Sequence, residues 1–190
     1  MRILLLGPQG SGKGTQAKRI AAGHGIPHVA TGEILRSAIA DGSGLGERVR
    51  PILERGDLVP DELMVDLIRE RLQDEDGFVL DGFPRTLPQA DALDAMLAEI
   101  GKPLDIVLFL QVGDEVASTR LLGRAAEEGR KDDEPSAIAN RLRNYHRETE
   151  PVVERYRAEG MLVPIPGERT VGEVAADIDA ALAHVAVRST

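Results

Sequence analysis

Short apolar runs alternate along the chain with longer segments in which apolar residues recur every three or four positions. Runs of the first kind are typical of strands buried on both faces, and segments of the second kind are typical of amphipathic helices. The predicted strands are 2–6, 27–30, 77–81, 104–112 and 161–165. The predicted helices are 13–24, 31–40, 47–55, a segment after Pro60, 87–100, 114–127, 135–158 and 171–185. Thr31 is expected to be the N-cap of its helix.

Strands that alternate with helices predict an α/β fold in which a doubly wound, parallel, five-stranded sheet carries helices on both faces. The sequence shows no internal repeat and no low-complexity linker. Glycine-rich segments near 41–46 and 123–129 interrupt the pattern, and 41–46 is expected to be a loop. Both segments are interpreted as hinges or flaps within one domain.

The stretch GPQGSGKGT at residues 7–15 directly follows the first predicted strand. Gly7, Gly12 and Lys13 match the phosphate-binding pattern GxxxxGK between a strand and a helix. Backbone N–H groups in such a loop surround an anion, and side chains would obstruct the turn. A plain glycine-rich turn is the alternative, but the flanking strand and helix argue against it. Gly14 stands where a Mg²⁺-binding hydroxyl usually follows the lysine, and Thr15 comes one residue later.

Composition narrows the class of protein. A chain of 190 residues is long enough for one hydrophobic core, and its net charge of -9 argues against a broad nucleic-acid-binding face. The chain has no cysteine, which excludes disulfides and thiolate metal sites. No apolar run reaches membrane-spanning length and no signal peptide is visible, so a cytoplasmic protein is expected. Arginine supplies 19 of the 23 basic residues, which reflects either codon bias or phosphate binding.

Three further segments carry groups suited to a second phosphate. Asp81 ends a predicted strand and begins the sequence DGFPR, so it is expected near the phosphates, where it can orient Mg²⁺-bound water. Arg85 follows closely and is placed for a second anion. The segments 31–36 (TGEILR) and 56–60 (GDLVP) lie beside predicted helix starts.

Taken in order, six motifs resemble the adenylate kinase family of nucleoside monophosphate kinases: GPQGSGKGT, TGEILR, GDLVP, DGFPRT with Gln89, GRKDDE and NRLRNYHRET. The resemblance implies a P-loop fold with a helical AMP-binding flap and a lid. It places ATP at Gly10, Ser11, Gly12, Lys13, Gly14, Thr15, Arg124 and Arg169. It places AMP at Thr31, Arg36, Asp57, Leu58, Val59, Gly82, Phe83, Pro84, Arg85, Gln89, Arg130 and Arg141. The catalytic residues that it implies are Lys13, Arg85, Arg124, Arg130 and Arg141. It also implies a cis peptide bond between Phe83 and Pro84.

The resemblance further implies a division of the chain into a core (1–29, 60–122 and 134–190), a flap (30–59) and a short lid (123–133). The short lid leaves no room for an inserted sheet, so zinc is not expected. Arg130 is expected on the lid and Arg141 on the helix behind it. Asp132 and Asp133 either brace these arginines or form a solvated acidic run.

The implied reaction is reversible, Mg²⁺-dependent transfer of the terminal phosphoryl group of ATP to AMP, which yields two ADP and serves adenine nucleotide homeostasis. Neither a nucleic acid nor a membrane partner is expected, and the family suggests a monomer. Gln89 has the donor and acceptor that an adenine edge requires, which favours AMP over UMP or CMP. The alternatives are a kinase of UMP, CMP or another small acceptor, and a nucleotide-binding module without transfer activity.

Overall fold

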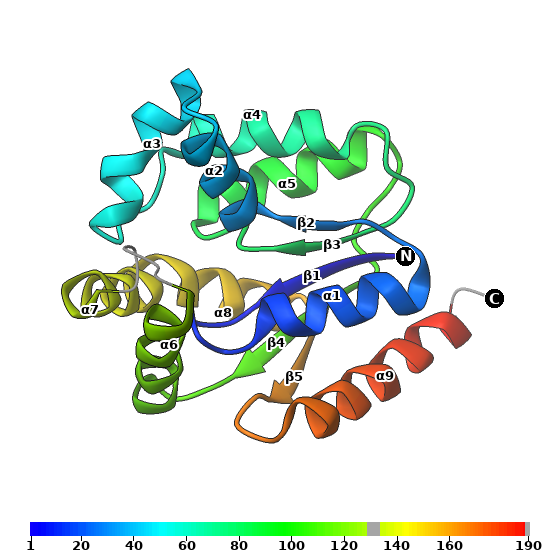
Figure 1. The fold of residues 1–190 in the computed structure, drawn as a ribbon. Coiled ribbons are helices and arrows are strands. Elements are labelled where there is room, and N and C mark those ends of the chain that lie inside the picture. The colour runs from blue at the N-terminus through cyan, green and yellow to red at the C-terminus, as the bar shows by residue number, and fades with distance from the viewer. Residues whose placement is uncertain (129–133, 189–190) are drawn as a thin grey trace.

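The computed structural model describes residues 1–128 and 134–188 (Figure 1). Its strands are β1 (Arg2–Leu6), β2 (His28–Ala30), β3 (Phe78–Asp81), β4 (Ile106–Gln111) and β5 (Leu162–Pro166). Its helices are α1 (Lys13–His24), α2 (Thr31–Ala40), α3 (Gly44–Glu54), α4 (Asp61–Leu72), α5 (Leu87–Glu99), α6 (Asp114–Glu128), α7 (Pro135–Asn144), α8 (Glu150–Ala158) and α9 (Val171–Arg188), and a π-helical turn, η2 (Tyr145–Thr149), joins α7 to α8.

The five strands form one parallel sheet in the order β2-β3-β1-β4-β5, which confirms the predicted fold class. β1 lies at the centre, where Leu4 pairs with Leu80 of β3 and with Val107 of β4. The strands in Figure 1 run toward α6 and α7, so their carboxyl ends all meet at that edge of the sheet. Ligand sites of open parallel sheets form at this edge.

Alternate residues of β1 enter two separate cores, which explains why the run 2–6 is almost continuously apolar. Ile3 and Leu5 pack with residues of α1 and α9 on one face. Leu4 and Leu6 pack with residues of α4, α5 and α8 on the other. A strand covered by helices on both sides has no polar face. No helix among residues 1–128 and 134–188 has the length and apolar character needed to cross a bilayer.

The long helix expected at 135–158 is interrupted, and Pro151 accounts for the interruption. Proline has no N–H, so Pro151 cannot donate to the carbonyl of Arg147 as a regular helix requires. The chain instead widens at η2, where the N–H of Glu150 donates to the carbonyl of Tyr145. A new helix, α8, then begins around Pro151. The Thr149 hydroxyl in the widened turn donates to the carbonyl of Arg85, 2.9 Å away.

Two other local expectations were wrong. Thr31 is the first residue of α2 rather than its N-cap, and its hydroxyl donates to the Asp81 carbonyl at 3.3 Å. The predicted loop at 41–46 already contains the start of α3, because the Ser43 side chain caps the helix by accepting from the N–H of Gly46. A Cβ on Gly46 would lie 2.0 Å from the Ala38 carbonyl oxygen, so the close approach of α3 to α2 requires glycine there.

Candidate functional site

A cleft of about 620 Å³ lies at the carboxyl edge of the sheet. Residues just after four strands contribute to its lining: Gly10 after β1, Thr31 after β2, Gly82 after β3 and Gly167 after β5. Helices α2, α4, α6 and α7 supply further lining residues. The cleft therefore draws on segments from most of the chain, and its volume is in the range of small-molecule sites.

The segment 7–15 forms a tight loop between β1 and α1. Gly7, Gly10 and Gly12 have φ values of 143°, 83° and 93°, which L residues with a side chain rarely adopt. A Cβ on Gly10 would lie 2.5 Å from the Ala117 carbonyl oxygen of α6. Gly12 is the N-cap of α1, so no side chain at the cap competes for the N–H groups of the first turn. The loop thus presents backbone donors and a helix N-terminus, both of which favour a phosphate group.

Lys13 is the cation of this loop. Its ammonium donates to the carbonyl oxygens of Gly7 and Pro8, each 2.8 Å away. Burial lowers the pKa of Lys13 to about 8, because desolvation disfavours the charged form. The charge of Asp81 opposes this shift, whereas Arg85 and Arg124 add to it.

Asp81 ends β3 and lines the floor of the cleft. Burial alone would raise the pKa of its carboxyl, but interactions with His28, Lys13 and Arg85 more than compensate and hold the pKa below its usual range. Its Oδ2 lies 3.8 Å from Nε2 of His28. Asp81 is therefore an ionised carboxylate in a cleft whose charged lining residues are mainly cations.

Three arginines from different elements converge beside the β3–α5 turn. Arg85 is held by a hydrogen bond from its Nε to the Gly82 carbonyl at 2.8 Å. Burial lowers the pKa of Arg85 to about 10, and the neighbouring charges of Arg141 and Arg36 add to the shift. Arg141 on α7 is only 8% exposed. Buried like charges repel one another, and a bound polyanion removes that cost, so the group forms an anion site.

Gln89 lies at the start of α5 and is 2% exposed. Its Oε1 accepts from the backbone N–H of Arg85 at 2.8 Å, and its Nε2 donates to Oδ1 of Asp61 at 2.7 Å. The Thr86 hydroxyl caps the helix by accepting from the Gln89 N–H. The peptide bond between Phe83 and Pro84 is cis, as the resemblance implied.

The turn at 56–60 is anchored on α7. The Asn140 amide donates to the Arg55 carbonyl at 2.9 Å and to Oδ1 of Asp57 at 2.7 Å. The Asn144 amide donates to the Gly56 carbonyl at 3.1 Å. These bonds hold one end of the segment 30–59 against the helix that carries Arg141.

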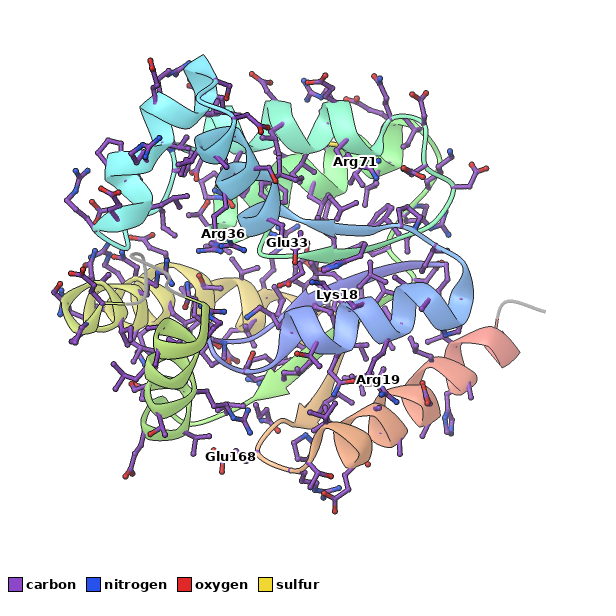
Figure 2. The ribbon with its side chains drawn as sticks, in the orientation of Figure 1. Lys18, Arg19, Glu33, Arg36, Arg71 and Glu168 are labelled. Atoms are coloured by element: carbon purple, nitrogen blue, oxygen red, sulfur yellow. The ribbon has the colours of Figure 1, made fainter. Side chains whose placement is uncertain are left out.

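Lys18 and Glu33, which were not among the predicted site residues, form an ion pair at the cleft. Figure 2 shows Lys18 on α1 and Glu33 on α2 facing one another, with Nζ 2.8 Å from Oε1. Both residues line the cleft. The hydrogen bond from Lys18 lowers the pKa of Glu33. This pair joins the phosphate-loop helix to the segment 30–59.

Nearly all predicted site residues line this one cleft: Gly10, Ser11, Gly12, Lys13, Gly14, Thr15, Thr31, Arg36, Asp57, Leu58, Val59, Asp81, Gly82, Arg85, Gln89, Arg124, Arg141 and Arg169. Phe83 and Pro84 are not among the lining residues, because both side chains are buried beneath the turn. Arg130, Asp132 and Asp133 lie outside the described residues.

Arg120 and Asp61 were also not predicted from the sequence. Arg120 lines the cleft and donates to the Gly167 carbonyl at 2.9 Å. Its spacing from Arg124, four residues along one helix, was a usable signal, because such residues share a helix face. Asp61 had no comparable signal, since its contact with Gln89 joins two helices.

The described residues contain no group of three or more histidine or carboxylate side chains that could hold a metal ion alone. Asp81 is one ionised carboxylate in the cleft, next to the phosphate loop, and Thr15 also lines the cleft. Mg²⁺ commonly binds through one or two carboxylates together with substrate phosphates. The donor set therefore fits Mg²⁺ carried in with a nucleotide.

The family model described as adenylate kinase matches residues 5–161. Among curated relatives, the adenylate kinase of Phenylobacterium zucineum is 47% identical over 189 residues, which are 98% of this chain and 100% of the relative. The adenylate kinase of Stenotrophomonas maltophilia is 46% identical over 96% of this chain and 99% of the relative. That of Xanthomonas campestris pv. campestris (strain B100) is 45% identical over the same shares.

Proposed function

Because the chain belongs to the adenylate kinase family, we propose that its cleft binds ATP and AMP together and transfers the terminal phosphoryl group directly between them. The family makes the chain a nucleoside monophosphate kinase that forms two ADP from ATP and AMP. One observation carries the proposal for the site: the phosphate loop and the pocket around Arg85 and Gln89 line the same cleft.

On the donor side, the loop residues Gly10, Ser11, Gly12, Lys13, Gly14 and Thr15 bind the ATP phosphates. Their backbone N–H groups and the N-terminus of α1 supply partial positive charge, and Lys13 supplies a full charge. Arg124 on α6 and Arg169 after β5, which line the same cleft, also bind ATP. A planar guanidinium both stacks on a base and binds phosphate, so arginine suits both positions.

On the acceptor side, Arg36, Arg85, Arg141 and Arg130 bind the AMP phosphate. Gln89 binds the adenine base, and Thr31, Gly82, Asp57, Leu58 and Val59 line the space for the nucleoside. Phe83 and Pro84 contribute by shaping the turn that carries Arg85.

Transfer requires positioning and charge neutralisation rather than a general base, because the attacking AMP oxygen is already ionised. Lys13, Arg85, Arg124, Arg130 and Arg141 would surround the moving phosphoryl group. Asp81 would hold Mg²⁺ through bound water, and the ion would supply further neutralisation of phosphate charge. No role for zinc is proposed.

We further propose that the segments 30–59 and 123–133 close over the nucleotides, while 1–29, 60–122 and 134–190 form the core. Closure keeps water from the phosphoryl group, which would otherwise be hydrolysed. The anchoring of Gly56 and Asp57 on α7 fixes one end of the flap, so its movement would hinge there. The proposed working unit is a single chain in the cytoplasm that acts on ATP, AMP and ADP without a nucleic acid or membrane partner.

The test is an acceptor panel. The purified chain is incubated with ATP, Mg²⁺ and either AMP, UMP or CMP, and diphosphate formation is followed. The proposal predicts two ADP for each AMP consumed, and a kcat/KM at least ~10-fold lower for the pyrimidine nucleotides. Equal or faster turnover of UMP or CMP would establish the alternative specificity. Nucleotide binding without any product would support a module that lacks transfer activity.

A further inference from the structure

The side-chain amide of Gln89 is held at both ends by groups with a single hydrogen-bonding role. The backbone N–H of Arg85 only donates, and it contacts Oε1 at 2.8 Å. The carboxylate of Asp61 only accepts, and it contacts Nε2 at 2.7 Å. Turning the amide over would set N–H against N–H at one end and oxygen against carboxylate at the other. Gln89 therefore has one permitted amide orientation.

We propose that Asp61 is a specificity-determining residue, which selects adenine over 6-oxopurines by holding the Gln89 amide in this orientation. The inference deepens the proposed function and rests on it, since it requires Gln89 to face the base of the acceptor nucleotide. Gln89 lines the cleft, whereas Asp61 is not among its lining residues. Asp61 thus acts through Gln89 as a positioning residue.

The fixed amide of Gln89 still has hydrogen-bonding groups that a ligand can use. A primary amide has two N–H protons and two lone pairs on oxygen. Asp61 takes one proton and Arg85 occupies one lone pair. One donor on Nε2 and one acceptor on Oε1 remain, and the two cannot exchange places while Asp61 and the Arg85 N–H hold the amide.

This remaining pair fits adenine and not its 6-oxo counterpart. Adenine presents an amino donor at C6 beside a ring-nitrogen acceptor, which pair with Oε1 and Nε2 respectively. Hypoxanthine, the base of inosine monophosphate, has a carbonyl acceptor at C6 and an N–H donor at N1. It would need the reversed amide, which Asp61 and the Arg85 N–H both oppose. Rejection of a ligand that leaves buried polar groups mismatched is a strong source of specificity.

The local fold keeps both clamps in place. The Thr86 hydroxyl caps α5 at the Gln89 N–H, and the Thr149 hydroxyl of η2 holds the Arg85 carbonyl. Asp61 is in the first turn of α4, where a carboxylate is favoured by the helix dipole. The helix start that carries Asp61 is therefore a favourable place for the acceptor that holds Nε2 of Gln89.

The test compares kcat/KM for AMP with kcat/KM for inosine monophosphate, both with saturating ATP. Asp61→Asn replaces a pure acceptor with an amide that can also donate, so it removes one of the two barriers to reversal. The ratio of the two kcat/KM values is expected to fall about 10-fold. Asp61→Ala, which removes the acceptor, should lower the ratio similarly and serves as a second variant should the first fail to fold.

Glu62→Gln is the matched control. Glu62 is the exposed neighbour of Asp61 in the same first helical turn, so this variant loses the same charge without touching Gln89. The ratio should stay within twofold of the parent value. A fall equal to that of Asp61→Asn would assign the effect to helix charge and overturn the inference.

Gln89→Ala separates the inference from the function on which it rests. If this variant raises KM for AMP but Asp61→Asn and Asp61→Ala leave the ratio unchanged, then Gln89 contacts the base and the inference about Asp61 is wrong. If Gln89→Ala leaves KM for AMP unchanged, then the proposed base site is itself wrong, and the inference falls with it.

Discussion

The phosphate loop and the pocket around Arg85 and Gln89 line the same cleft, but they are built differently. The loop binds through backbone, and glycines at positive φ keep side chains away from it. The pocket binds through side chains, and Arg36, Arg85, Arg141 and Gln89 come from three separate helices and a turn. The first site should therefore be damaged by adding a side chain, and the second by removing one.

The largest expected effect is on the side-chain pocket. Arg85→Ala should raise the barrier to phosphoryl transfer by about 3 kcal/mol, a loss in kcat of roughly 10²-fold, by analogy with the removal of a charge-stabilising donor. Steady-state kinetics with ATP and AMP measures the change. Arg71→Ala is the control, because Arg71 lies on α4 away from the cleft and pairs with Glu75 (Figure 2). A kcat within threefold of the parent would remove Arg85 from the catalytic group.

The loop is tested by adding a methyl group. Gly12→Ala should lower the free energy of unfolding by about 1–2 kcal/mol through its positive φ alone, since no atom beyond the adjoining residues lies within 4 Å of the added Cβ. Gly10→Ala should cost about 1 kcal/mol more, because its Cβ would also meet the Ala117 carbonyl at 2.5 Å.

Chemical denaturation of the ligand-free variants gives both values. If the two substitutions lower the free energy of unfolding equally, then α6 shifts to accommodate the methyl group at Gly10. The loop would then tolerate side chains better than its packing indicates.

Lys13 is the one charged side chain of the loop, and its pKa of about 8 predicts a pH dependence. The cation is present below that pH and is lost as pH rises through it. The kcat/KM for ATP, which reports the free enzyme, should therefore fall about 10-fold per pH unit above pH 8. Lys13→Arg should move this fall to higher pH, whatever its overall activity. A flat profile between pH 7.5 and 9.5 would contradict the assignment.

The smallest expected effect concerns His146, which lies outside both the phosphate loop and the pocket around Arg85 and Gln89. Its protonation should change stability and leave catalysis unchanged. His146 contacts Asp114 at 2.9 Å and Glu150 at 2.9 Å, and these carboxylates raise its pKa. A raised pKa stabilises the fold fully below the unfolded value near 6.5, and the contribution is lost as pH rises through the folded value.

Because the His146 side chain is 44% exposed, the contribution is a few tenths of a kcal/mol. Denaturation of the parent and of His146→Gln between pH 5.5 and 8 measures it, and only the parent should lose this stability on going to higher pH. If kcat/KM changed with pH in the same way as stability, His146 would also contribute to the functional site.

The difference between a loop of contiguous residues and a pocket of side chains from separate elements also explains what could be predicted from the sequence. The run from Ile3 to Leu6 and the loop that follows are contiguous, so strand, loop and helix were all predicted correctly. Contacts between distant segments were harder: nothing local to Asp61 indicates that it meets Gln89, 28 residues away. Pro151 was visible, yet the π-helical turn before it was missed, because the helical pattern continues through the interruption.

The proposed function requires two nucleotides to meet in one cleft. A compound that joins two adenosines through five phosphates tests this directly, by calorimetric titration and by inhibition kinetics. One molecule should bind per chain, and inhibition should be competitive with both ATP and AMP. Two molecules bound per chain, or competition with only one of the two nucleotides, would contradict the proposed function.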